Sequence, residues 1–185
     1  MIAAGCDPGL TSGGLVILDT AARRVLLSYE WRPMAKRKAD PEATIEHRLT
    51  VDGALTVERI PRSAHVGSCG AWLAAQPAWP AAVARVEVCA VEGVGYYGPG
   101  HGRSQADARA ASAMWREWLI GQTGKVPAVV MPHEWRRMLP KGGRTSGALD
   151  RRASLWCDLT LPGHGLTTAG GWDAACMGWW AWHRR

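Results

Sequence analysis

Phenylalanine is absent from the sequence, and the aromatic residues are 11 tryptophans and three tyrosines. We interpret this as a preference for Trp at core positions, without functional meaning. Long apolar runs are also lacking, since none approaches the roughly 18 residues that cross a bilayer. The N-terminus has no charged segment followed by an apolar one, so we expect no signal peptide and no membrane partner.

Cysteine is scarce and scattered. The chain has five cysteines, an odd number, and none forms a CxxC pair. Neither a disulfide framework nor a zinc ribbon is therefore predicted. Such cysteine usage is typical of a reducing cytoplasm, and we expect a cytoplasmic protein of a bacterial cell or of a virus-infected host cell.

What the sequence does contain is sufficient for one folded domain over residues 1–185. Hydrophobic residues make up 47% and charged residues 21%, which excludes disorder as the default state. The 22 Lys and Arg residues outnumber the 16 Asp and Glu residues, giving a formal net charge of +6. This basic balance favours an anionic partner, nucleic acid first.

Strand patterns dominate the first part of the chain and then alternate with helical ones. We predict strands over 1–6, 14–18, 24–31, 86–91 and 126–131, with a hairpin over 45–60. We predict helices over 63–76, 104–122, 133–139 and 146–158, and a last one from about Trp172. This order predicts an α/β or α+β domain with a mixed sheet.

Three acidic residues lie where predicted elements start or stop. Asp7 ends the first strand, Glu92 ends the strand over 86–91, and Asp173 opens the last helix. Carboxylates at element ends can converge on one rim of a sheet and bind Mg²⁺, which prefers oxygen ligands. Taken singly, Asp7 also fits a turn residue and Asp173 a helix cap.

The sequence around each acid resembles a motif of the RuvC-type Holliday junction resolvases. The family's first motif is matched by the segment Gly5-Cys6-Asp7-Pro8-Gly9-Leu10-Thr11-Ser12-Gly13-Gly14 of this chain, which resembles it. The second acidic motif is similar to Ala90-Val91-Glu92-Gly93-Val94, and the closing helix to Asp173-Ala174-Ala175-Cys176-Met177-Gly178. The resemblance covers these motifs and most of 86–185. It is thin between 30 and 65, so we expect an extra loop or hairpin around 32–62.

The resemblance implies an RNase H-like fold, with a mixed five-stranded sheet flanked by helices. It implies an endonuclease that resolves Holliday junctions or other branched DNA. Asp7, Glu92 and Asp173 would hold two Mg²⁺ ions, or Mn²⁺, and an activated water would attack the phosphorus. No nucleotide cofactor is expected. Two-fold junction symmetry favours a C2 homodimer, for which the resemblance assigns the helix 104–122 to the interface. That helix carries the small residues Ala106, Ala110 and Ala113.

One position departs from the resembled pattern. Family members usually have a further ligand, acidic or His, three residues before the last Asp, where this chain has Gly170. We therefore expect the helix to begin later, with Asp173 at its mouth, and His164 to be a metal ligand from the preceding loop. Asp158 and Asp150 are weaker substitutes, and a solvated loop role for His164 stays open.

Aromatic and basic residues supply the candidates for DNA contact. The resemblance implies an aromatic wedge after Glu92, for which Tyr96 and Tyr97 are candidates. Aromatic rings among glycines favour base stacking, although one Tyr could instead anchor the loop. A basic cluster spans 136–152 and is expected to follow the DNA backbone, with a solvated helix face as the alternative. The basic candidates are Arg103, Arg136, Arg137, Lys141, Arg144, Arg151 and Arg152.

Three other functions remain open from the sequence. One is a nucleic-acid-binding protein of the same fold that has lost catalysis, as the missing ligand at Gly170 would allow. Another is an RNase H-like nuclease that acts on flaps or RNA hybrids. The third is an actin-like ATPase or sugar kinase, whose first motif also joins Asp and Gly. That class needs two lobes, and 185 residues hold one.

Overall fold

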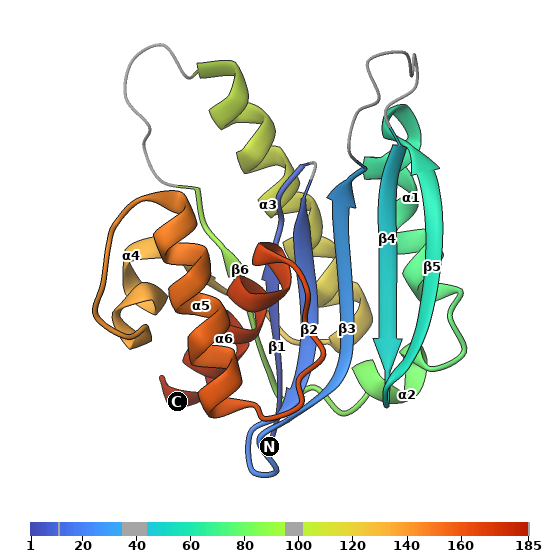
Figure 1. Ribbon diagram of the computed structural model, residues 1–185. Helices are drawn as coiled ribbons and strands as arrows, with labels where there is room; N and C mark the ends of the chain where they lie inside the picture. The colour runs from blue at the N-terminus through green and yellow to red at the C-terminus, as the bar shows by residue number, and fades with distance from the viewer. Residues whose placement is uncertain (11, 35–43, 95–101, 185) are drawn as a thin grey trace.

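The computed structural model places one mixed sheet between two layers of helices (Figure 1). It describes residues 1–10, 12–34, 44–94 and 102–184, and for 62–67 and 102–104 the backbone alone. The sheet has seven strands in the order β5-β4-β3-β2-β1-β6-β7. The strands are β1 (Ile2–Asp7), β2 (Gly13–Asp19), β3 (Arg24–Pro33), β4 (Thr44–Val51), β5 (Ala54–Pro61), β6 (Val88–Glu92) and β7 (Ala128–Val130).

The expected mixed sheet is present, but it has seven strands where we predicted five. Strands β1 to β5 pair antiparallel in succession, whereas β6 and β7 add parallel to the other side of β1. The hairpin predicted over 45–60 forms β4 and β5, with Asp52 and Gly53 at positive φ in its turn. Because β4 pairs with β3 over the full length from Ile45 to Val51, the hairpin extends the sheet instead of forming a separate loop.

The helices divide between the two faces of the sheet. They are α1 (Arg62–Ala74), α2 (Trp79–Val83), α3 (Gly102–Thr123), α4 (Pro132–Trp135), the 3₁₀ turn η1 (Arg136–Met138), α5 (Ser146–Thr160) and α6 (Ala169–His183). Helices α1, α2 and α3 pack on one face, and α4, α5 and α6 pack on the other. In the described part of the chain, no helix has the length and apolar character that a bilayer span requires.

Alternation along β1 explains the two cores. Ile2, Ala4 and Cys6 face α3, whereas Ala3 and Gly5 face α6. All five cysteines lie buried in the described part of the chain, and none of them forms a disulfide there. The tryptophans fill both cores as expected: Trp31 and Trp115 stack on one face, and Trp156 meets Trp179 edge-on on the other.

The last helix begins earlier than we predicted. Thr168 caps α6 by accepting a hydrogen bond from the Gly171 backbone nitrogen at 3.1 Å, so the first turn contains Gly170. Asp173 therefore lies in the second turn, and the expectation that it stands at the helix mouth was wrong. A run of small residues hid the true start, because Ala169-Gly170-Gly171 shows no apolar periodicity.

Candidate active site

The ends of β1 and β6 bring Asp7 and Glu92 to the same edge of the sheet. The two strands are parallel neighbours in which Cys6 pairs with Val91, so the next residue of each strand is an acid. Side chains alternate along a strand. Val88 and Ala90 pack in the α6 core, so Glu92 points to the same face as they do. Gly5 faces α6, and Asp7 follows with the same orientation.

The turn after β1 holds the Asp7 carboxylate. Asp7 Oδ1 accepts a hydrogen bond from the Gly9 nitrogen at 3.2 Å. Trp31 on β3 donates its indole N–H to the Gly9 carbonyl at 2.8 Å, which ties the Asp-Pro-Gly turn to the sheet. The motif noted in the sequence therefore forms a braced turn with its carboxylate directed to the α6 side.

Glu92 is oriented by a buried tryptophan that the sequence analysis did not assign. Trp135, at the end of α4, is 1% exposed and donates its indole N–H to Glu92 Oε1 at 3.1 Å. The Glu92 carbonyl accepts a hydrogen bond from Ser112 of α3 at 2.8 Å. A buried Trp needs a partner for its N–H, which was the available signal for this contact.

Asp173 reaches the other two acids because α6 packs unusually close to β1. A Cβ atom on Gly5 would overlap the Ala174 carbonyl, and one on Gly178 would lie 3.0 Å from the Gly5 nitrogen. The absence of side chains at these glycines lets the helix and the strand meet backbone to backbone. The close approach sets Asp173 above the end of β1.

Burial raises the pKa of all three carboxyl groups, and the charge of Glu92 raises the pKa values of both aspartates further. Loss of water is the main cause for Asp7, whose pKa lies well above its usual value, and the charges of Glu92 and Asp173 raise it further. Burial and the charge of Glu92 raise the pKa of Asp173 to about 8. Burial also raises the pKa of Glu92, although the Trp135 hydrogen bond and the Arg136 charge oppose it. The effect of the Glu92 charge on both aspartates is consistent with the sequence prediction that these acids converge.

The chemistry of the cluster suits a divalent cation. Among the ion pairs of the described residues, none involves Asp7, Glu92 or Asp173. A bound cation would offset the charge repulsion that raises their pKa values. In this described part, no three His, Cys, Asp or Glu side chains lie close enough together to hold a metal ion. The acids therefore fit a metal by residue type and charge, and binding would have to draw them closer.

Close packing against β2 explains why position 170 is a glycine. A Cβ atom at this position would overlap the backbone of Gly13 on β2. No ligating side chain can therefore stand there while α6 keeps this position.

The three substitutes for Gly170 lie in different surroundings. Asp150 on α5 is close enough that its charge raises the pKa of Asp173. His164 instead contacts Asp158 Oδ1 through Nε2 at 3.0 Å, and its Nδ1 accepts from the Leu166 nitrogen at 2.9 Å. Both ring nitrogens are thus engaged within their own segment, and this geometry gives no support to His164 as a ligand.

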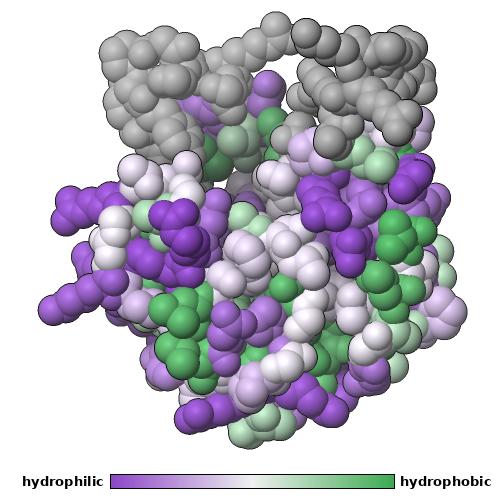
Figure 2. All heavy atoms as spheres, in the orientation of Figure 1, coloured by the Kyte–Doolittle hydropathy of each residue, from purple (hydrophilic) through white to green (hydrophobic). Residues whose placement is uncertain are grey.

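A basic hollow lies next to Glu92. It has a volume of about 730 Å³, and its lining includes Glu92, His133, Arg136, Arg137, Arg144 and Arg152. Hydrophilic residues gather over α4 and the beginning of α5 in the space-filling view (Figure 2). The predicted cluster over 136–152 therefore borders the carboxylates instead of lying elsewhere on the surface.

Arg136 is the basic residue that affects all three acids. Its charge lowers the pKa of Asp7, Glu92 and Asp173. The guanidinium carbon lies 5.2 Å from the centre of the Trp135 ring, and the buried Nε has no hydrogen-bond partner among the described residues. A cation held beside carboxylates without pairing with them can receive a second anion.

The other predicted DNA contacts divide into three groups. Arg137, Lys141, Arg144 and Arg151 are exposed. Arg152 donates to the carbonyls of Pro140 and Gly143, so it also braces the loop before α5. The backbone of Arg103 lies in the first turn of α3, while its side chain, Tyr96 and Tyr97 lie outside the described residues.

Comparison with solved structures identifies the architecture. A Thermus thermophilus RuvC structure matches with a TM-score of 0.51 and 15% identity, covering 97% of this chain and 92% of that one. The T. thermophilus RuvC structure in complex with a Holliday junction substrate matches with the same TM-score and coverage at 14% identity. The chain has a RuvC-like fold. No family model matches the sequence, and neither does any curated protein. The RuvC-like core corresponds to the mixed sheet and flanking helices that the resemblance implied.

Proposed function

We propose that this RuvC-like protein is a divalent-metal-dependent endonuclease that cuts branched DNA, with a four-way junction as its substrate. The observation that carries the proposal is the pairing of two features at one edge of the sheet. Three carboxylates without an ion-pair partner in the described chain lie beside a hollow with four arginines. One feature suits cations and the other suits phosphate, as phosphodiester hydrolysis requires.

Each residue has a distinct part in this reaction. Asp7, Glu92 and Asp173 would hold two Mg²⁺ or Mn²⁺ ions, with Asp150, whose charge raises the pKa of Asp173, as a further carboxylate. When bound, the ions would activate water and stabilise the attacking and leaving oxygens. Arg136 lies where it can contact the scissile phosphate, and its charge would favour the developing negative charge there. No side-chain nucleophile is required.

The arginines of the hollow would hold the DNA backbone without reading sequence. Contacts of this kind release counterions, so binding should weaken steeply with salt. Discrimination of a branch from a duplex would then depend on the placement of two DNA arms. One of the matched T. thermophilus RuvC structures is a complex with a Holliday junction substrate, and this supports the choice of a four-way junction here.

We further propose that the active form is a C2 homodimer, because paired cuts need two sites related by the junction's symmetry. Ala106, Ala110 and Ala113 on α3 are exposed, which supports this helix as the contact surface. Equilibrium sedimentation of wild type and Ala110→Glu would test this. The wild type is expected to be dimeric and the variant to dissociate, whereas a monomeric wild type would refute the dimer.

A substrate panel tests the proposed reaction. The protein is incubated in Mg²⁺ with a four-way junction, a flap, an RNA–DNA hybrid and a linear duplex of matched sequence. We expect paired nicks in the junction and little cutting of the duplex. Preferential cutting of the flap or hybrid would redirect the substrate assignment. Tight junction binding with no cutting in Mg²⁺ or Mn²⁺ would indicate the catalytically impaired binding protein.

A further inference from the structure

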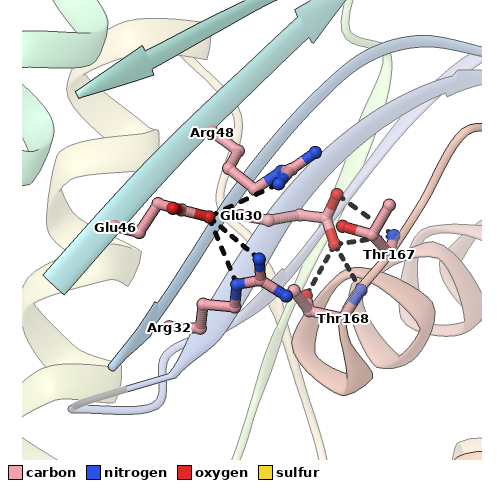
Figure 3. A network of polar contacts seen from close by, with 6 residues as sticks. All are labelled: Glu30, Arg32, Glu46, Arg48, Thr167 and Thr168. Atoms are coloured by element: carbon pink, nitrogen blue, oxygen red, sulfur yellow. Dashed lines mark hydrogen bonds and ion pairs between the residues drawn. The ribbon is translucent and has the colours of Figure 1, made fainter. Parts of the chain in front are cut away.

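A buried glutamate on the far side of α6 from Asp7 accepts several hydrogen bonds from the start of that helix. Glu30 on β3 is 1% exposed. Its Oε2 accepts from the Thr168 nitrogen at 2.7 Å, the Thr168 hydroxyl at 2.6 Å and the Thr167 nitrogen at 3.1 Å. Figure 3 shows the Glu30 carboxylate directed at these two threonines at the start of α6.

These contacts join Glu30 to the cap of α6. The Thr168 hydroxyl donates to Glu30 and accepts from the Gly171 nitrogen, which fixes the direction of its hydrogen. A Cβ atom on Gly171 would lie 2.5 Å from Glu30 Oε2, so the first helical turn rests against the carboxylate. A negative charge at a helix N-terminus is also favoured by the helix dipole.

Strand register places Glu30 and Asp7 on opposite sides of the same helix turn. Asp7 pairs with Gly14 on β2, and Gly14 pairs with Glu30 on β3. Directly opposite residues point to the same face of a sheet. With strands about 4.8 Å apart, the Cα atoms of Asp7 and Glu30 are separated by roughly 10 Å.

Gly14 leaves the space between them open for the helix. A Cβ atom on Gly14 would lie 2.6 Å from the Gly170 carbonyl oxygen, so the first turn of α6 stands directly above this glycine. Glu30 holds that turn from one side, and Asp173 follows in the next turn, toward Asp7. The anchor point and the carboxylate therefore belong to one short rigid segment.

We propose that Glu30 is a positioning residue for Asp173, which sets the spacing of the Asp173 and Asp7 carboxylates and thereby the affinity of the site for divalent cations. The inference rests on the proposed function for its biological meaning, but the metal affinity can be measured separately. Glu30 touches none of the reacting groups and acts through Thr168 and the backbone of α6. Partners that orient metal ligands typically contribute 10–100-fold to metal affinity or activity.

The chain offers a matched control on the next strand. Glu46 on β4 shares this face of the sheet, but its Oε1 pairs with Arg32 at 3.0 Å and Arg48 at 3.4 Å (Figure 3). The Arg32 contact joins β3 to β4, the Arg48 contact lies within β4, and neither reaches α6. Glu46→Gln therefore removes a carboxylate charge close to Glu30 without releasing the helix.

The test is a Mn²⁺ titration of the full-length protein, followed by electron paramagnetic resonance, for wild type, Glu30→Gln and Glu46→Gln. We expect Glu30→Gln to bind Mn²⁺ roughly 10–100-fold more weakly and Glu46→Gln to bind as wild type does. Junction affinity without divalent ions should stay within about twofold in both variants, because the basic hollow is unchanged. Equal Mn²⁺ affinity in Glu30→Gln and wild type would overturn the proposal.

A second pair of variants covers the case in which Glu30→Gln does not fold. Thr168→Val removes the hydroxyl that links Glu30 to Gly171, whereas Thr168→Ser keeps it. Weakened Mn²⁺ binding in Thr168→Val with recovery in Thr168→Ser supports the proposal, and wild-type binding in both overturns it. If wild type binds Mn²⁺ but cuts no junction, the proposed function fails while the role of Glu30 is still decided by these affinities.

Discussion

Replacing Asp173 with Asn should change how stability depends on pH, because this carboxyl group has a pKa of about 8 in the fold against an ordinary value of 3.8. Between about pH 5 and pH 7 the folded protein keeps a proton that the unfolded chain has released. Stability therefore falls as pH rises through this window. Unfolding releases that proton, and the release becomes more favourable as the proton concentration falls. The metal-free wild type should be most stable at the acidic end.

The size of the effect follows from the number of protons. One bound proton corresponds to about 1.4 kcal/mol of unfolding free energy per pH unit, or about 2.7 kcal/mol from pH 5 to pH 7. In a domain of this size, that corresponds to roughly 5–10 °C in Tm. Asp173→Asn removes the titrating group. From pH 5 to pH 7 the unfolding free energy of the variant should therefore fall by about 2.7 kcal/mol less than that of the wild type.

The assay is urea unfolding at several pH values in EDTA, followed by circular dichroism, for wild type, Asp173→Asn and Glu46→Gln. Arg32 and Arg48 lower the pKa of Glu46, so that group is ionised in both states across the window and its variant should keep the wild-type slope. Saturating Mg²⁺ at pH 8 should stabilise wild type by about 2.7 kcal/mol at 100 times its Kd, and Asp173→Asn much less. Identical pH slopes in wild type and Asp173→Asn would refute the reasoning.

Four further substitutions test other parts of the site. Asp150→Asn should lower the junction cleavage rate about tenfold, whereas His164→Ala should keep it within about twofold; the reverse order in single-turnover assays would restore His164 as a ligand. Arg144→Ala should weaken junction binding and reduce the slope of log affinity against log salt by about 0.9, and an unchanged slope would move the DNA path elsewhere. Trp135→Phe removes the N–H that orients Glu92 and should lower the cleavage rate roughly tenfold or more, with the loss partly restored by higher Mg²⁺; a wild-type Mg²⁺ profile would count against that role.

Local patterns in the sequence were enough to predict the strands that carry the acids. The apolar run before Asp7 and the one before Glu92 each predict a buried strand, and parallel pairing then places both ends at one edge. The start of α6 was missed because its first turn has only small residues. These small residues allow α6 to pack against Gly13 and Gly14 of a distant strand, and no local pattern reveals that contact.

Contacts between distant segments account for the rest of what the sequence did not predict. Glu30 looks like an ordinary strand residue, and its role follows only from the register of β3 against β2 and from the place of α6. Trp135 packs in the core, as a tryptophan commonly does, but its hydrogen bond to Glu92 depends on how α4 meets β6. No helix was predicted over α2, because a proline inside a segment usually indicates the end of a helix, whereas Pro80 occupies the first turn of this one.

The most direct test of the account is single-turnover cleavage of a synthetic four-way junction by wild type and Asp7→Asn, each with Mg²⁺ and with EDTA. Asp7 is the acid whose pKa is raised by the charges of both others. The account predicts paired nicks by wild type in Mg²⁺ alone, and a loss of about a thousandfold or more in Asp7→Asn at unchanged junction affinity. Cleavage by Asp7→Asn near the wild-type rate, or equal wild-type cleavage in EDTA, would contradict it.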